Sequence, residues 1–197
     1  MIWEHSFNSA LVKIWDSPND APRHIHSLRD TLKLDVRKKE WDRVEQCLLP
    51  QYTHDDVIKN DWGQPSLKDG KFISISHSGN YAAVGTSRFP IGIDIQIPHD
   101  SVFNIRNKFC HKEELLFLQE DAADNRYLKL WCAKEAIFKI YGHRVDFSND
   151  LRSEPFQQKD LEVVFHQQGA YHKKEELLVQ FIQNPSYFVA IAQKLKQ

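Results

Sequence analysis

The alternation of apolar and polar residues predicts that the first half of the chain holds a strand followed by a long helix. Residues 10–15 alternate as a half-buried strand does. Residues 23–49 are expected to be helical, because Trp41, Val44 and Leu48 follow the i, i+3, i+7 spacing of an apolar stripe. The many charges of this segment then form either a solvated helix face or an anion-binding patch.

Runs with strand character recur along the rest of the chain, at residues 72–76, 81–85, 91–97, 161–165, 177–182 and 187–192. Turn residues 78–80 join the first two runs into a hairpin, and residues 184–186 join the last two. In residues 91–97 the isoleucines point one way, so Asp94 and Gln96 share the opposite face. This strand therefore carries polar groups that either face solvent or meet a ligand.

Residues 126–142 predict a helix that is buried on most sides and ends at Gly142. Its apolar side chains occupy nearly every direction around the axis, so charges within it need a reason. Glu135 and Lys139 are i,i+4 neighbours on one face, and Lys134 lies on the next stripe. They form either an ordinary ion pair or an anion-binding group in which the lysines hold Glu135 ionised. Shorter helical segments are expected at 103–110 and 112–118.

The two hairpins echo each other, because Tyr81 and Tyr187 each follow a hairpin turn. We therefore expect an α+β fold of two similar lobes, residues 1–95 and 96–197, each with an antiparallel sheet and a packed helix. The two lobes are expected to form one compact unit.

The composition is that of an ordinary globular protein, with 197 residues, 41% hydrophobic and 27% charged. A net charge of -1 argues against a nucleic-acid-binding surface that covers the molecule. Cys47, Cys110 and Cys132 form neither a CxxC pattern nor a disulfide framework, so we expect reduced thiols. Because we find no signal peptide and no apolar run of about 20 residues, we expect a cytoplasmic protein.

Three separate motifs carry a resemblance to a known family. They are Ser74-Ile75-Ser76-His77-Ser78, Gly92-Ile93-Asp94 and Trp131-Cys132-Ala133-Lys134-Glu135-Ala136-Ile137-Phe138-Lys139. In order and spacing they resemble the signature motifs of the Sfp-type 4′-phosphopantetheinyl transferases. The resemblance extends from about Arg37 to the C-terminus.

The resemblance implies a pseudo-twofold fold of two α+β lobes, with coenzyme A and Mg²⁺ bound in the cleft between them. It implies transfer of the 4′-phosphopantetheine group from coenzyme A to a serine of an apo acyl or peptidyl carrier protein. The protein is then expected to be a monomer that binds neither nucleic acid nor membranes. Phe103, Arg106, Lys108, Phe109 and Lys112 are the expected surface for the carrier, because acidic carriers favour a basic and apolar partner.

The resemblance also implies roles for individual residues. Asp94, Glu135 and Gln96 would hold the metal, and Glu135 would accept the serine proton. Lys134 would keep Glu135 anionic or contact the pyrophosphate. Contacts to coenzyme A are expected from Ser76, His77, Lys139, Arg37, Lys38 and Arg43.

Three positions depart from the pattern of many relatives. Gln96 stands where a glutamate is common, Gln64 replaces the lysine of a Gly-Lys-Pro segment, and Glu45 stands where a basic residue is common. These departures leave open a silent relative that binds coenzyme A or a carrier without catalysis. A third alternative is an unrelated α+β protein in which the motifs are structural.

Overall fold

The computed structural model describes residues 1–7, 10–16, 30–118, 125–141, 145–157, 160–168 and 175–194, without the side chains of residues 30–37. The chain divides into two compact units, Met1–Phe89 and Pro90–Gln197. This division precedes the boundary expected at residue 95, because strand β7 (Ile91–Gln96) pairs with β11 (Tyr187–Lys194) of the second unit. Asp94 and Gln96 therefore belong to the second unit.

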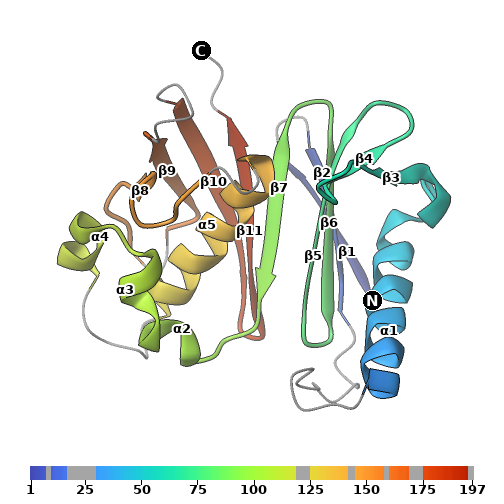
Figure 1. Ribbon diagram of the computed structural model, residues 1–197, viewed down its shortest axis with the longest axis horizontal. Helices are drawn as coiled ribbons and strands as arrows, with labels where there is room; N and C mark the ends of the chain where they lie inside the picture. Colours follow the sequence, from blue (N-terminus) through green and yellow to red (C-terminus); the bar gives the residue numbers. More distant parts are fainter. Residues whose placement is uncertain are drawn as a thin grey trace. The chain divides into compact units, whose positions relative to one another are not determined.

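The first unit is built on a six-stranded antiparallel sheet in the order β1-β2-β6-β5-β4-β3. Its elements are β1 (Ile2–Phe7), β2 (Ala10–Trp15), α1 (Asp30–Leu48), η2 (His54–Asp56), β3 (Val57–Lys59), β4 (Pro65–Leu67), β5 (Phe72–Ser78) and β6 (Tyr81–Ser87). Helix α1 packs on β6 and β2 (Figure 1). Val44 and Leu48 of α1 lie in one buried cluster with Ile73 and Val84 of the sheet, and Trp41 packs against it. The apolar stripe predicted for this helix is confirmed.

The second unit is built on a five-stranded antiparallel sheet in the order β7-β11-β10-β9-β8. Its further elements are α2 (Ser101–Asn104), α3 (Arg106–Phe109), α4 (Lys112–Phe117), α5 (Arg126–Tyr141), β8 (Leu151–Ser153), β9 (Glu162–Gln167) and β10 (Glu175–Asn184). Helix α5 packs on β7 and β11 (Figure 1). It is buried over most of its surface, as its sequence predicted.

Gly92 allows α5 to approach β7 unusually closely. A Cβ atom at this position would lie 1.8 Å from the carbonyl oxygen of Ala136. No side chain fits there, so the glycine sets the separation between the strand and the helix that carries Glu135.

Both units repeat one arrangement of strand, helix and hairpin. In the first unit β2 pairs with β6, which pairs with β5; in the second, β7 pairs with β11, which pairs with β10. The hairpins also match in register, since Ser78 pairs with Tyr81 and Asn184 with Tyr187. The expected α+β class, with an antiparallel sheet and a packed helix in each half, is confirmed.

The sequence patterns missed β1 and the three-residue strands β3, β4 and β8. Three residues are too few for an alternation to be recognised, and β1 is largely exposed at the sheet edge. Two earlier expectations, helix at residues 23–29 and a helix end at Gly142, lie outside the described residues.

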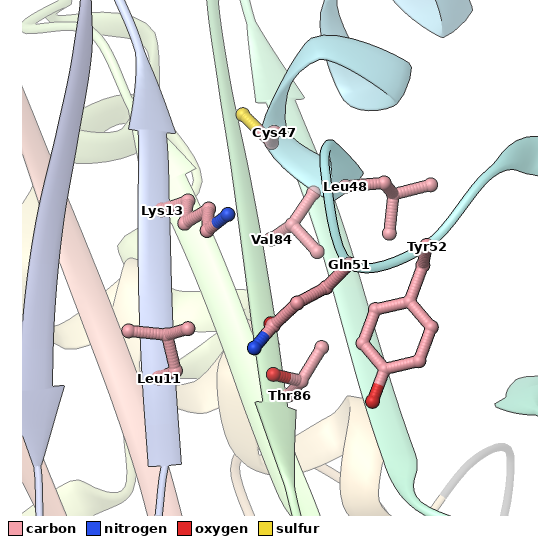
Figure 2. A pocket seen from close by; sticks show the side chains of 8 residues that line it. All are labelled: Leu11, Lys13, Cys47, Leu48, Gln51, Tyr52, Val84 and Thr86. Atoms are coloured by element: carbon pink, nitrogen blue, oxygen red, sulfur yellow. The ribbon is translucent and has the colours of Figure 1, made fainter. Parts of the chain in front are cut away.

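A small hollow lies between the sheet of the first unit and the C-terminal end of α1 (Figure 2). Its lining consists of Leu11, Lys13, Cys47, Leu48, Gln51, Tyr52, Val84 and Thr86. The free volume of about 10 Å³ suits one water molecule and no larger ligand. Lys13 uses its ammonium to bind the carbonyl of Leu49 at 2.9 Å, which ties β2 to the end of α1. This hollow is therefore a structural feature.

Candidate functional site

Asp94 of β7 is a buried carboxylate, only 3% exposed, with a partner at each oxygen. The Lys139 ammonium donates to Oδ1 at 2.9 Å and to the carbonyl of Ile93 at 2.7 Å. The Gln96 amide donates to Oδ2 at 2.8 Å. Because a buried carboxylate is costly without partners, these contacts offset the cost of burying Asp94.

Glu135 of α5 is half-buried and belongs to the same cluster. Burial raises the pKa of its carboxyl, the nearby charge of Asp94 raises it further, and Lys139 lowers it. Glu135 and Lys139 stand one helical turn apart, and α5 lies against β7 where Gly92 permits close approach. The fold thus brings together Asp94, Gln96, Glu135 and Lys139, all of which were predicted as site residues.

The ammonium of Lys134 does not contact Glu135, the carboxylate that the family resemblance linked to it. Its side chain is fully buried, and its ammonium lies 2.5 Å from Glu114 Oε2. It also donates to three backbone carbonyls, at Phe109, Phe147 and Leu151, at 2.8 to 3.0 Å. An ammonium enclosed in this way is directed at Glu114 and not at Glu135, so it does not hold Glu135 anionic by contact.

The donor set near Asp94 fits a hard divalent cation, although no three His, Cys, Asp or Glu side chains of the described residues converge as a metal site. Mg²⁺ is typically held by one or two carboxylates plus substrate phosphates and water. Asp94 and Glu135 supply two carboxylates that repel each other, and a cation would relieve that repulsion. Gln96 turns its amide NH₂ toward Asp94, so its oxygen would reach a metal only after the amide rotates.

In the first unit, α1 meets the tip of the β5–β6 hairpin. Arg43 donates to the carbonyl of Gly79 at 2.9 Å, and His77 Nδ1 lies 3.4 Å from Glu40 Oε1. The His77 side chain is 47% exposed, whereas Ser76 is buried. Arg43 and His77 are therefore brought to the same end of the sheet, where they could meet an anion.

The remaining predicted contacts are less defined. Lys38 is exposed on α1, and the side chain of Arg37 lies outside the described part of the chain. Gln64 closes a loop with Asn60, which accepts its backbone N–H at 2.9 Å. The nearby cation Lys71 is paired with Asp69 at 2.8 Å and with the Tyr52 hydroxyl at 2.6 Å.

Two acidic partners were missed by sequence reasoning, Glu114 for Lys134 and Glu40 for His77. Glu114 had a local signal, because a glutamate at the third position of a helix is typical of a capping box. Its carboxylate accepts the N–H of His111 at 2.7 Å at the start of α4. Its second partnership depends on a contact between residues 20 positions apart, which no periodic pattern encodes.

Residues 90–192, about half of the chain, match the 4′-phosphopantetheinyl transferase superfamily. The chain belongs to this superfamily, and the match covers Asp94, Gln96, Glu114, Glu135 and Lys139 of the second unit. It is 31% identical over 87 residues to the 4′-phosphopantetheinyl transferase gsp of Aneurinibacillus migulanus, a match that covers 43% of this chain and 37% of that protein. It is 29% identical over 111 residues to a Haemophilus influenzae protein named "Putative 4'-phosphopantetheinyl transferase", covering 52% of this chain and 47% of that protein.

The matched segments thus span less than half the length of either relative. Among the helices in the described ranges, none is long and apolar enough to cross a membrane.

Proposed function

We propose that this protein transfers the 4′-phosphopantetheine group from coenzyme A to a serine hydroxyl of an apo acyl or peptidyl carrier protein, with Mg²⁺ as cofactor. The observation that carries the proposal is the cluster of Asp94, Glu135 and Lys139, held together by β7 and α5 inside the segment that matches the superfamily. Two carboxylates and an ammonium are the groups that a metal-assisted phosphoryl transfer needs.

Asp94 and Glu135 would hold the magnesium ion, with Gln96 as a further oxygen ligand if its amide rotates. When bound, the ion supplies positive charge to the pyrophosphate of coenzyme A, which offsets the charge on the leaving phosphate. Lys139 lies 27% exposed beside Asp94, so its ammonium is within reach of both the carboxylate and an incoming phosphate. We assign Lys139 to phosphate binding.

The serine oxygen would attack the phosphorus that bears the pantetheine arm. A new phosphorus–oxygen bond forms to serine, the bond to adenosine 3′,5′-bisphosphate breaks, and the serine proton passes to Glu135 directly or through water. A raised pKa suits Glu135 for this task, because a carboxylate that binds protons more readily is a better base. No covalent enzyme intermediate is needed, so positioning and electrostatics would supply most of the catalysis.

Phosphate contacts from the first unit would come from Arg43 and His77, with Lys38, Arg37 and Ser76 as further candidates. The proposal for Arg43 and His77 is supported by their position, because both lie at the tip of the β5–β6 hairpin. An arginine offers several fixed donors to phosphate oxygens, and the histidine adds a charge when protonated.

For the carrier protein we propose the surface of α3 and the start of α4. Arg106 lies 4.0 Å from the centre of the Phe103 ring, and Lys108 and Lys112 are exposed. Phe109 is buried and would support this surface without touching the carrier. An acidic helix of the carrier would then contact these cations, of which Arg106 lies beside the apolar ring of Phe103.

The test is intact-mass spectrometry of apo carrier proteins incubated with this protein, coenzyme A and Mg²⁺. We expect a phosphopantetheine mass gain that Glu135→Ala abolishes and that Glu162→Ala, which removes an exposed acid of β9 in the same unit, leaves unchanged. Gln96, Gln64 and Glu45 favour a second candidate, a silent relative. Coenzyme A binding by calorimetry, without mass gain on any carrier, would support that candidate and contradict the transferase.

A further inference from the structure

Lys134 and Glu114 form an ion pair with no exposure to solvent at either side chain. The ammonium can donate three hydrogen bonds, and it has four acceptors: Glu114 and the carbonyls of Phe109, Phe147 and Leu151. Every donor of Lys134 is therefore engaged inside the second unit. Lys134 therefore has no hydrogen-bond donor available for a substrate.

Glu114 is equally engaged. Its Oε2 also accepts from the backbone N–H of His111 at 2.7 Å, and its Oε1 accepts from that of Ser153 at 2.8 Å. Together the two side chains connect α5 to the end of α3, the start of α4, the segment after α5 and strand β8. The pair is the point at which these separate segments are fixed to one helix.

The stability of the fold alone is a weak reason for this pair. Removing two charges from water costs several kcal/mol per ion, and well-packed apolar residues of similar volume often serve as well or better. A buried, fully bonded charge pair does, however, restrict its surroundings to one geometry. The structure therefore suggests that what the pair contributes is the orientation of α5.

That orientation bears directly on Glu135, the next residue in the chain. On one side α5 is in contact with β7 through Ala136 and Gly92, where a Cβ would lie 1.8 Å from the carbonyl oxygen. Lys134 anchors the helix to α3, α4 and β8. These two anchors, at Lys134 and Ala136, fix the rotation of the helix, and Glu135 lies between them in sequence.

We propose that Lys134 and Glu114 are positioning residues that hold α5 in the rotation that places Glu135 beside Asp94. This inference rests on the proposed function, in which Glu135 takes the serine proton and shares a metal with Asp94. It assigns Lys134 no contact with coenzyme A. An error of about 1 Å in the placement of a reacting group can cost about a hundredfold in rate, so loosening the helix is expected to lower turnover.

The test uses a double-mutant cycle of Glu114→Gln, Lys134→Met and both together. We expect each single variant to lower kcat at least about tenfold while KM for coenzyme A changes less than about twofold. The double variant is expected to be no worse than the worse single variant, because both changes break the same pair. If Lys134→Met does not fold, Glu114→Gln alone decides, since it keeps the shape of the side chain.

Lys129→Met is the matched control. Lys129 is another fully buried lysine of α5, and it donates to the carbonyls of Gln157 and Asp160, away from Glu114. Its loss is expected to lower thermal stability without lowering kcat of the folded protein. If Glu114→Gln behaves like this control, the pair is merely structural and the inference fails. If Lys134→Met lowers kcat and Glu114→Gln does not, Lys134 acts on substrate, which also overturns the inference.

A second measurement separates this inference from the proposed function. Binding of Mn²⁺, followed by electron paramagnetic resonance, reports on Asp94 and Glu135 without any transfer. We expect Glu114→Gln to weaken Mn²⁺ binding at least about fivefold and Lys129→Met to leave it unchanged. A wild-type protein that transfers nothing but shows this pattern would refute the transferase and keep the positioning role. Mn²⁺ binding that is absent, or indifferent to Glu114→Gln, would count against the pair.

Discussion

The candidate site residues of the two units differ in how far they are buried. In the second unit, Asp94 is 3% exposed and bonded to Lys139 and Gln96. In the first, the His77 side chain is 47% exposed, and the half-buried Arg43 donates to the backbone carbonyl of Gly79 at 2.9 Å. Buried charges are tolerated only with fixed partners, whereas exposed ones keep their water and their freedom. Under the proposed function, the second unit would carry out the chemistry and the first would bind an anion with adjustable contacts.

This difference predicts how each unit responds to substitution. Removing a buried, bonded carboxylate disturbs its partners as well, so the effect on turnover is expected to be large. Removing a partly exposed cation such as Arg43 leaves the buried groups of the second unit in place, so the effect is expected on substrate binding.

Asp94→Asn should have the largest effect. The amide keeps the shape but removes the charge that pairs with Lys139 at 2.9 Å and that, under the proposed function, would hold a metal. We expect kcat for carrier modification to fall at least about a thousandfold, as measured by mass spectrometry over time. Glu162→Gln, on the exposed face of the same sheet, should retain full activity. Near-normal turnover by Asp94→Asn would remove the contrast between the units.

Arg43→Ala should have a moderate effect of a different kind. We expect KM for coenzyme A to rise about tenfold while kcat stays within about threefold, because one phosphate contact is worth about 1–3 kcal/mol. Arg88→Ala is the control, since Arg88 is exposed beyond the opposite end of β6 from the hairpin tip. A fall in kcat with unchanged KM would show that the first unit also takes part in the chemical step.

Gln96→Glu should have the smallest effect, and it tests whether position 96 takes part in metal binding in the second unit. A third carboxylate replaces the amide that donates to Asp94 at 2.8 Å, so it repels Asp94 until a divalent cation binds. The Mg²⁺ concentration for half-maximal activity is expected to fall about threefold or more, and thermal stability without metal is also expected to fall.

Gln180→Glu on β10 makes the same chemical change where the amide donates to Glu162 at 2.6 Å. This control should leave the Mg²⁺ requirement as it is. A raised or unchanged requirement in Gln96→Glu would mean that position 96 does not face the metal.

Sequence patterns predicted the strands and helices whose periodicity is long enough to see, including both hairpins and the buried helix α5. They could not give the partner of Lys134, because Glu114 reaches it only after α4 and α5 have packed. The motif placed Lys134 beside Glu135 along the chain, but successive helical residues point in different directions. The proximity of Asp94 to Glu135 came from the family resemblance, since the two residues lie on different elements.

Gly92 has a consequence for how tolerance to mutation is interpreted. Because any side chain there would collide with the backbone of α5, a scan of all single substitutions should find position 92 as intolerant as Asp94. Such a scan would place Gly92 among the residues essential for activity. What matters at this position is that glycine has no side chain. A position that tolerates no substitution next to a reactive group can therefore set the distance between two elements without taking part in the reaction.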